Sequence, residues 1–355
     1  MPPLNTPVPA WLRYPGPDQD VVLSTRCRIA RNIAGMPFPW RASELQRKSA
    51  AEAILDGAHR GGGPLSRAKS LHADNLTEED FETLESRRYT TRDWSVPGSY
   101  KFVLIPLSGD LSLLINEEDH IRLQAILPGL QAEAAAELAR DAEVRVSRSI
   151  DYAIDERIGY LTSSLSNAGT GARMSVLLHL AGLGRIQMLE ATLQASLQTG
   201  CTVRGLFGEG SEGTGAFFQV SNKCAFGLEF RQIVDRVGAS ARYLVQAERS
   251  AREKLFGDEK GLKRLREELN RAAGLLFTND VAPDDLLRQV SLFRLAAAEG
   301  VIEGDLTDAS EWVYLAGSCV DVDRGSAAER FQSIRRSAAL RRHLRALLEG
   351  QELYE

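Results

Sequence analysis

The strand-like pattern of this chain nearly stops at about residue 240, and that change constrains the fold more than any other feature of the sequence. Before it, apolar strand-like runs alternate with helical segments, as in 21–30, 101–116 and 203–223. After it, helical spacing dominates in three segments: 247–277, 283–300 and 329–350. The chain is therefore predicted to join an α+β part to an all-helical C-terminal part, and its 355 residues suit about two domains.

Local patterns predict the first elements of the α+β part. Residues 1–20 are rich in proline and are predicted to form an extended lead-in. Residues 101–116 are typical of a hairpin, and Thr77 with Asp80 matches the capping box that opens a helix. Three further helices and one further strand are predicted: helices over 42–58, 131–154 and 172–183, and a strand over 157–164.

Composition excludes several classes of protein. The hydrophobic fraction of 43% and the charged fraction of 26% are typical of a globular protein. The chain has neither an apolar run of membrane-spanning length nor a signal-peptide pattern at its start, so a cytoplasmic protein without membrane contact is expected. A net charge of −5 disfavours direct nucleic-acid binding. Neither a zinc site nor a disulfide framework is expected from the scattered cysteines, Cys27, Cys201, Cys224 and Cys319.

The common nucleotide-binding motifs are absent. The sequence has no Walker A loop and no H-R-D or D-F-G pair of the usual protein kinases. Residues 208–213 match G-x-G-x-x-G, but a strand rather than a helix is predicted to follow. Glu209 and Glu212 in this loop would also repel a pyrophosphate. A dinucleotide site is therefore disfavoured.

A row of acids and several arginines stand at strand ends and loop edges. Glu117, Glu118 and Asp119 follow the apolar strand of the hairpin, where a solvated turn is the plain interpretation. Arg26 and Arg28 stand two apart, on one face of a strand, and two further arginines border glycine-rich turns, Arg173 and Arg204. Each alone is typical of a surface arginine, but together they indicate a cage of guanidinium forks around a polyphosphate. The basic residues are 36 arginines and 7 lysines, so such a cage needs no lysine.

Four motifs in order resemble the catalytic domain of the phosphagen (guanidino) kinases. They are S-T-R-C-R, N-E-E-D-H-I-R, N-A-G-T-G-A-R and R-G-L-F-G-E-G-S-E, within a resemblance that covers 21–237. The stretch 159–180 is most similar to the bacterial branch, the protein-arginine kinases (McsB family). The first motif begins at Ser24, so the N-terminal helical domain of the metabolite-directed branch is not expected here. The helical C-terminal part is instead similar to the dimerisation domain of the protein-arginine kinases.

The resemblance implies an α+β fold, with an antiparallel sheet flanked by helices over 21–245 and an all-helical domain over 246–355. It implies ATP and Mg²⁺ as cofactors, with the ion held mostly by the phosphates and by water. Glu118 would be the catalytic base, and Glu209 would clamp the substrate guanidinium. The positions it assigns to the nucleotide are Ser24, Thr25, Arg26, Cys27, Arg28, Arg122, Arg173, Met174, Ser175, Val176, Leu177, Arg204, Gly205, Leu206, Phe207 and Gly208.

The acceptor limits how such a base can act. An arginine guanidinium has a pKa above about 12.5, whereas a carboxylate has a pKa near 4.3. This difference in pKa corresponds to about 11 kcal/mol for the proton transfer. Glu118 is therefore expected to take the proton only as the N–P bond forms. Crowding by Glu117 and Asp119 is expected to raise its pKa. Asp119 is expected to support this geometry, and His120 to have a structural role.

Two positions depart from the family pattern. Ser164 stands where the family usually has a cysteine, so a thiolate near the guanidinium is lost. The stretch 332–337 retains one arginine of the R-D-x-x-R-A motif that forms an allosteric phosphoarginine pocket, and loses the acid. That pocket is therefore not expected to be intact. The basic stretch 330–345 is interpreted as a solvated helix face or, alternatively, as a docking surface for an acidic partner.

The predicted function is ATP-dependent phosphorylation of arginine residues in proteins, within bacterial protein quality control. One alternative is a kinase for free arginine or another small guanidine, and another is a catalytically weak adaptor that binds nucleotide or phosphoarginine. The family implies a homodimer, a small zinc-binding activator protein and an AAA+ unfoldase-protease as partners. The many arginines also make self-phosphorylation an expectation.

Overall fold

The structure is a computed structural model that describes residues 6–91, 94, 98, 100–205, 214–276, 283–303, 305–307, 309, 310 and 313. The chain divides into two compact units whose segments alternate along the sequence. Unit 1 comprises Met1–Arg13, Ser24–Val176 and Ser221–Ala239. Unit 2 comprises Tyr14–Leu23, Leu177–Val220 and Ser240–Glu355.

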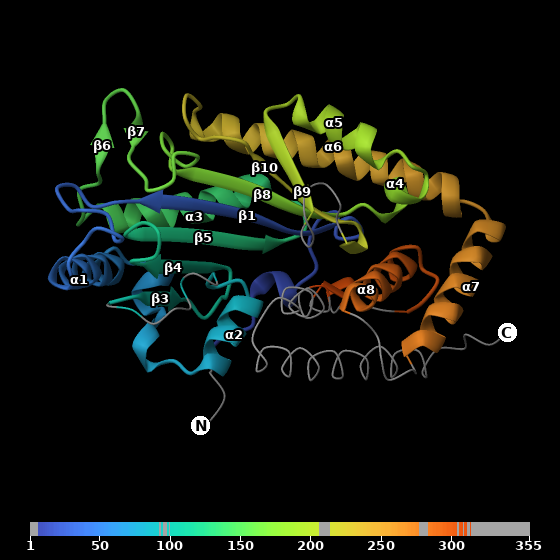
Figure 1. The fold of residues 1–355 in the computed structure, drawn as a ribbon, viewed down its shortest axis with the longest axis horizontal. Coiled ribbons are helices and arrows are strands. Elements are labelled where there is room, and N and C mark those ends of the chain that lie inside the picture. The colour runs from blue at the N-terminus through green and yellow to red at the C-terminus, as the bar shows by residue number, and fades with distance from the viewer. Residues whose placement is uncertain are drawn as a thin grey trace. The chain divides into compact units, whose positions relative to one another are not determined.

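Eight of the described strands form one sheet in the order β2-β3-β4-β5-β1-β8-β10-β9 (Figure 1). The pairs β2–β3, β3–β4, β4–β5 and β1–β5 are antiparallel. The strands are β1 (Val22–Arg31), β2 (Lys69–His72), β3 (Phe102–Ile105), β4 (Leu111–Ile115), β5 (Ile121–Pro128), β8 (Ala172–His179), β9 (Cys201–Gly205) and β10 (Phe217–Asn222). A separate ribbon pairs β6 (Ile154–Asp155) with β7 (Gly159–Tyr160).

Helices alternate with these strands and then dominate the C-terminal half of the described chain. They are α1 (Glu44–Arg60), α2 (Glu78–Ser86), α3 (Ala132–Ser147), α4 (Ala181–Arg185), α5 (Leu189–Leu197), α6 (Phe230–Phe256), α7 (Glu259–Leu276) and α8 (Pro283–Ala298). Single 3-10 turns are η1 (Ala10–Leu12), η2 (Pro64–Arg67), η3 (Ala73–Asn75) and η4 (Thr214–Ala216). The predicted α+β class, with an antiparallel sheet flanked by helices, is confirmed. Among the described residues, no helix has the length and apolarity that a membrane crossing requires.

Side-chain caps fix where two of these helices begin. Ser43 and Gln46 form a reciprocal capping box at the start of α1. Thr77 and Asp80 form the predicted one at α2: the Asp80 N–H donates to Thr77 Oγ1 at 3.3 Å, and the Thr77 N–H donates to Asp80 Oδ2 at 2.9 Å. The predicted hairpin of 101–116 is present as β3 and β4.

Three predicted elements were wrong in kind or extent. Residues 172–179 form β8 rather than a helix. All residues of β8 except Arg173 are buried, and the hydrophobic pattern of such a short buried run does not distinguish a strand from a helix. Only Gly159 and Tyr160 of the strand predicted over 157–164 pair as a strand. The helix predicted over 131–154 ends at Ser147.

Unit 1 has a conventional apolar core. The side chains of Leu84, Trp94, Val103 and Leu114 are at most 2% exposed and belong to one cluster beneath α2 and the β3–β4 pair. On β5 the sheet is covered by α3, which also packs against α1. This core supports the hairpin turn between β4 and β5, where the acids stand.

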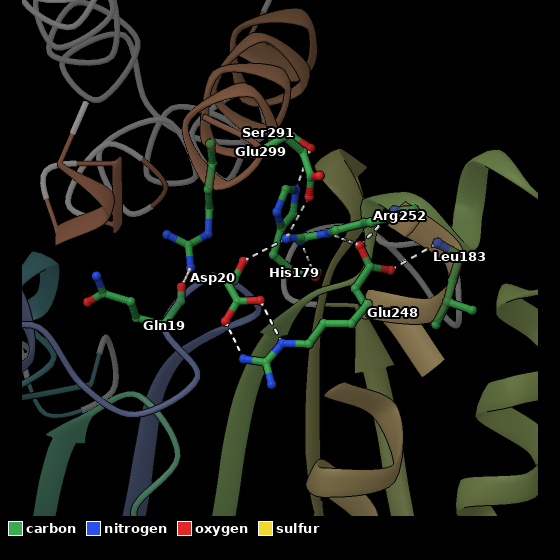
Figure 2. Close-up of polar contacts among 11 residues, drawn as sticks. Gln19, Asp20, His179, Leu183, Glu248, Arg252, Ser291 and Glu299 are labelled. Carbon is green, nitrogen blue, oxygen red and sulfur yellow. Dashed lines mark hydrogen bonds and ion pairs between the residues drawn. The ribbon is translucent and has the colours of Figure 1, made fainter. Parts of the chain in front are cut away.

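Unit 2 contains a buried polar network beside its apolar side chains, shown in Figure 2. Glu248 of α6 is fully buried, and its carboxylate accepts the N–H groups of Gly182 and Leu183 at 2.8 and 2.9 Å and Arg252 Nε at 2.7 Å. Arg252 also donates to the Asp20 carbonyl at 3.1 Å. The network therefore ties the segment before β1 to α4 and α6.

A buried histidine extends the same network. His179 Nε2 is 2.7 Å from Ser291 Oγ of α8 (Figure 2). The His179 ring also stacks on Phe217. Burial, with Arg252, Arg294 and Arg185 nearby, holds the pKa of His179 well below its usual range. The ring is therefore neutral and serves packing rather than proton transfer.

Candidate active site

The three acids lie in the turn of the β4–β5 hairpin. Ile115 pairs with Ile121, and the Asn116 N–H donates to the His120 carbonyl at 3.1 Å across the turn. Asn116 has a φ of 55°, a left-handed conformation that asparagine adopts more readily than most residues. Its side-chain Nδ2 donates to the carbonyls of Arg47 and Tyr100, each at 2.9 Å. The start of the turn is thus fixed by one buried side chain.

Each acid of this turn has a different environment. Glu117 accepts hydrogen bonds from Thr91 Oγ1 at 2.8 Å and from Arg122. Asp119 is 2% exposed, and its Oδ1 accepts from Asn32 Nδ2 at 2.6 Å and from the Ser163 N–H at 2.7 Å. Glu118 is exposed, and no described residue donates a hydrogen bond to its carboxylate. Within the described chain, Glu118 is the acid of the turn that is open to a ligand.

These environments separate the three pKa values. Burial favours a neutral Glu117, but Arg122, the Glu118 N–H and Thr91 outweigh it and lower the pKa of Glu117. Partial burial, followed by the negative charges of Asp119 and Glu117, raises the pKa of Glu118, although Arg122 opposes the change. Burial also raises the pKa of Asp119. The crowding expected from the sequence therefore acts on Glu118 in the direction that suits a base.

Four arginines of unit 1 gather beside this turn. Arg26 and Arg28 lie on one face of β1, and Arg122 of β5 pairs with Ala30 on that same face. Burial, and then the positive charges of Arg26, Arg122 and Arg173, hold the pKa of Arg28 well below its usual range, with Glu117 acting against them. Cationic groups packed this closely repel one another, and a bound polyanion would relieve this repulsion. The cluster is therefore suited to bind a polyanion.

Other positions assigned to the nucleotide are mostly buried in the strands. Burial raises the pKa of Cys27 to about 12, which makes it no nucleophile at neutral pH. Thr25 Oγ1 donates to the Gly129 carbonyl at 2.6 Å and accepts the Gln131 N–H, so it anchors the start of α3. The Met174 N–H donates to Asn222 Oδ1 at 2.9 Å. The buried set also includes Ser24, Ser175, Val176 and Leu177.

The last predicted motif is only partly described. Arg204 and Gly205 lie on β9, which belongs to unit 2. Leu206, Phe207, Gly208 and Glu209 lie outside the described residues, as does 332–337. Unit 1 therefore brings together Glu118 and the predicted arginines Arg26, Arg28, Arg122 and Arg173.

Two residues of the site are not among those predicted from the sequence. Asn32 is 1% exposed and contacts both Asp119 and the backbone of His120. The Ser163 hydroxyl donates to the Glu118 carbonyl at 2.7 Å. Asn32 directly follows the strand that ends at Arg31. Its position as a polar residue at a strand end was the one signal in the sequence that could have indicated it.

His120 supports the turn as a neutral side chain. It is fully buried, its Nδ1 accepts the Ile33 N–H at 3.3 Å, and burial lowers its pKa to about 4. An unfolded histidine titrates near 6.5, so stability is present above that pH and is lost as the pH falls toward 4. Between pH 8 and pH 5 this loss is about 2 kcal/mol.

We therefore expect His120→Asn to lose less unfolding free energy than the wild type between pH 8 and pH 5. Asparagine does not titrate, and its carbonyl can still accept a hydrogen bond. Urea unfolding of both proteins at the two pH values measures the difference, and every other titrating group is common to both. Equal losses in the two proteins would show that His120 is not buried as a neutral ring.

Comparisons with known proteins show the family of the chain. The sequence profile of the ATP:guanido phosphotransferase C-terminal catalytic domain matches residues 63–251. A protein-arginine kinase of Halothermothrix orenii is 32% identical over 351 residues, 99% of this chain and 93% of that protein. One of Geobacillus kaustophilus is 38% identical over 252 residues, 71% of this chain and 69% of that protein.

Solved structures show the same fold at lower identity. The substrate-free duplicated taurocyamine kinase from Schistosoma mansoni matches 77% of this chain and 42% of its own, with a TM-score of 0.60 and 23% identity. A lombricine kinase matches 70% of this chain and 73% of its own, with a TM-score of 0.57 and 21% identity.

Proposed function

Because the chain belongs to the ATP:guanido phosphotransferase family and, within it, to the protein-arginine kinases, we propose that it transfers the γ-phosphoryl group of ATP to the guanidinium of arginine residues in proteins. One observation supports this proposal most: the open carboxylate of Glu118 stands in a turn beside four arginines. A base next to a polyanion site is the minimum that this reaction needs.

The arginines neutralise and orient the triphosphate. Phosphoryl transfer depends on positioning and on stabilising charge that spreads over the phosphoryl oxygens. Arg26, Arg28, Arg122 and Arg173 can supply forked donors for this, without a Walker A lysine. Glu117 already pairs with Arg122, so Mg²⁺ would be held by phosphate oxygens and water rather than by this acid. The ion would supply positive charge that offsets the negative charge of the phosphates.

Glu118 receives the proton of the acceptor. As the guanidinium nitrogen forms its bond to the γ-phosphorus, the bond from that phosphorus to the ADP oxygen breaks. The nitrogen loses one proton to the Glu118 carboxylate, which later releases it to water. The products are ADP and a phosphoarginine residue. The raised pKa of Glu118 reduces the difference between its pKa and that of the acceptor guanidinium. Proton transfer still takes place together with formation of the N–P bond.

Further roles rest on the family resemblance. Arg204 is proposed as a fifth phosphate ligand and Glu209 as the clamp for the acceptor guanidinium. Ser164, whose Oγ is 2.9 Å from Ser166 Oγ, is proposed to replace the family cysteine without supplying a thiolate. A cytoplasmic homodimer, divided into a catalytic part up to residue 245 and a helical part after it, is proposed on the same basis. So are a zinc-binding activator and an AAA+ unfoldase-protease as partners.

Two other functions lead to different results. A kinase for free arginine would use the same Glu118 and arginine cluster, so the acceptor must be tested directly. An adaptor that binds nucleotide without transfer would not need an open carboxylate beside its phosphate site. The exposed Glu118 therefore favours an enzyme over an adaptor.

Labelling separates these functions. The chain is incubated with Mg-ATP labelled at the γ-phosphate and either an arginine-rich protein mixture or free arginine. Acid-labile label on protein arginines is expected, and Glu118→Gln is the control. Label on free arginine alone would contradict the proposal in favour of a small-guanidine kinase. Binding of ATP without any transfer would favour the adaptor.

A further inference from the structure

Asn32 holds the acid turn through its side-chain amide, which also contacts the segment at Leu161. It stands just after β1 and is 1% exposed. Its Nδ2 donates to Asp119 Oδ1 at 2.6 Å and to the Leu161 carbonyl at 3.1 Å. Its Oδ1 accepts the His120 N–H at 3.0 Å. Both amide hydrogens and the oxygen are therefore satisfied by groups far away in the sequence.

Ser163 holds the same turn from the other side. Its N–H donates to Asp119 Oδ1 at 2.7 Å, and its hydroxyl donates to the Glu118 carbonyl at 2.7 Å. Asp119 Oδ1 thus accepts from both Asn32 and Ser163. The residue on the C-terminal side of Glu118 and the Glu118 backbone itself are fixed by two segments far apart in the sequence, at 32 and at 161–163, which the Asn32–Leu161 hydrogen bond also joins.

We infer that Asn32 is a positioning residue for phosphoryl transfer, which acts through Asp119 and the His120 amide to fix the backbone that presents Glu118, with Ser163 completing the clamp. This inference rests on the proposed function, because Glu118 is the base in that reaction. Neither Asn32 nor Ser163 needs to touch substrate for this role.

The need for such a clamp follows from the exposure of Glu118. No described residue donates a hydrogen bond to its carboxylate, so the position of the base depends on the backbone below it. Misplacement of a reacting group by about 1 Å can cost about 100-fold in rate. A freely moving turn would therefore lower kcat without changing the arginines that bind ATP. A residue with only a structural role would instead change stability and leave kcat and KM of the folded enzyme unchanged.

The test uses the full chain and three variants that alter the Asn32–Asp119 pair. Asn32→Ala removes the clamp, and kcat is expected to fall about 10- to 100-fold, with the KM for ATP changed less than about 2-fold. Asn32→Asp places two carboxylates at hydrogen-bond distance. Asp119 and Glu118 then become harder to ionise, so the acid limb of the pH–rate profile is expected to move to higher pH.

The double variant Asn32→Asp with Asp119→Asn tests the pairing itself. It exchanges donor and acceptor across the same bond, keeps an acceptor for the His120 N–H and restores a single negative charge, while the Ser163 N–H, which shares the exchanged Asp119 Oδ1, loses its acceptor. We expect it to recover part of the kcat lost by Asn32→Asp, and to return the acid limb toward that of the wild type. Kinetics that are no better than those of Asn32→Asp would contradict the pairing.

A control variant removes a partly buried hydrogen bond elsewhere. The Thr192 hydroxyl of α5 donates to the Met188 carbonyl at 2.7 Å, and Thr192 is a buried residue. Thr192→Val is expected to lower Tm while kcat of the folded fraction stays within about 2-fold of the wild type. If Asn32→Ala gives the same pattern as Thr192→Val, its role is structural only and the inference is wrong.

Hydrogen exchange separates this inference from the proposed function. The His120 amide is expected to exchange faster in Asn32→Ala than in the wild type, at a pH where both are fully folded. A wild type without transferase activity would refute the proposed function and with it the catalytic part of the inference. Active wild type with unchanged kcat and unchanged His120 exchange in Asn32→Ala would refute the inference alone.

Discussion

Glu118→Gln is expected to lower kcat by about 10²- to 10⁴-fold while ATP affinity stays nearly unchanged. Glutamine retains the size of the side chain but cannot accept the proton that the acceptor nitrogen loses. The arginines that hold the triphosphate are untouched, so nucleotide binding has no reason to fall. Steady-state kinetics on a protein substrate give kcat, and the rise of Tm with ATP gives the affinity.

The pH dependence provides a second readout of the same variant. The base must be ionised, so the kcat of the wild type is expected to fall as pH drops through the raised pKa of Glu118. Glu118→Gln should lose this acid limb together with most of its rate. Glu156, an exposed acid of the β6–β7 turn, is the matched control, and Glu156→Gln should keep both. If Glu118→Gln retained at least a third of the wild-type rate, Glu118 could not be the base.

Arg28→Met is expected to lower kcat/KM for ATP by about 10²- to 10³-fold and at the same time to stabilise the nucleotide-free protein. Arg28 is partly buried among Arg26, Arg122 and Arg173, and its depressed pKa shows that its charge is unfavourable there. Methionine fills similar space and removes the repulsion. A gain of about 1 kcal/mol would raise Tm by about 1–2 °C for a chain of 355 residues.

Two comparisons isolate this effect. Arg28→Lys keeps the charge but loses the planar fork, so it should recover little activity and gain little stability. Arg60 lies on the exposed side of α1 in an ion pair with Asp56 and is the control for removing an arginine as such. Arg60→Met should change neither activity nor Tm by much. A lower nucleotide-free Tm in Arg28→Met, or an undiminished response of Tm to ATP, would contradict the proposed phosphate site.

The elements that the sequence predicted well are those with a local cause. The capping box of Thr77 and Asp80 and the hairpin of β3 and β4 depend on residues close together in the chain. β8 was mistaken for a helix because its burial comes from its neighbours in the sheet, β1 and β10, which lie far away in the sequence. A central strand that is buried on both faces has no alternation to reveal it.

The same distinction applies to the candidate site. Charged side chains such as Glu118 and Arg28 stand in recognisable motifs, so the sequence identified them. Asn32 contacts a residue 87 positions away, and Ser163 contacts one 44 positions away. Nothing in the local pattern distinguishes such residues from ordinary polar ones. The groups that react could be predicted, whereas the groups that hold them in place required the fold.

The buried arginines of the structure bear on a different question, which is how an arginine-modifying enzyme avoids damaging itself. Arg31, Arg252 and Arg294 are at most 5% exposed. Arg252 gives its three guanidinium nitrogens to Glu248, Asp20 and His179 (Figure 2). A nitrogen that donates inside the core cannot reach a phosphoryl donor unless the chain unfolds. Self-phosphorylation would then be confined to exposed arginines such as Arg231, whose side chain is 73% exposed. The buried arginines that stabilise the fold would not be phosphorylated while the chain is folded.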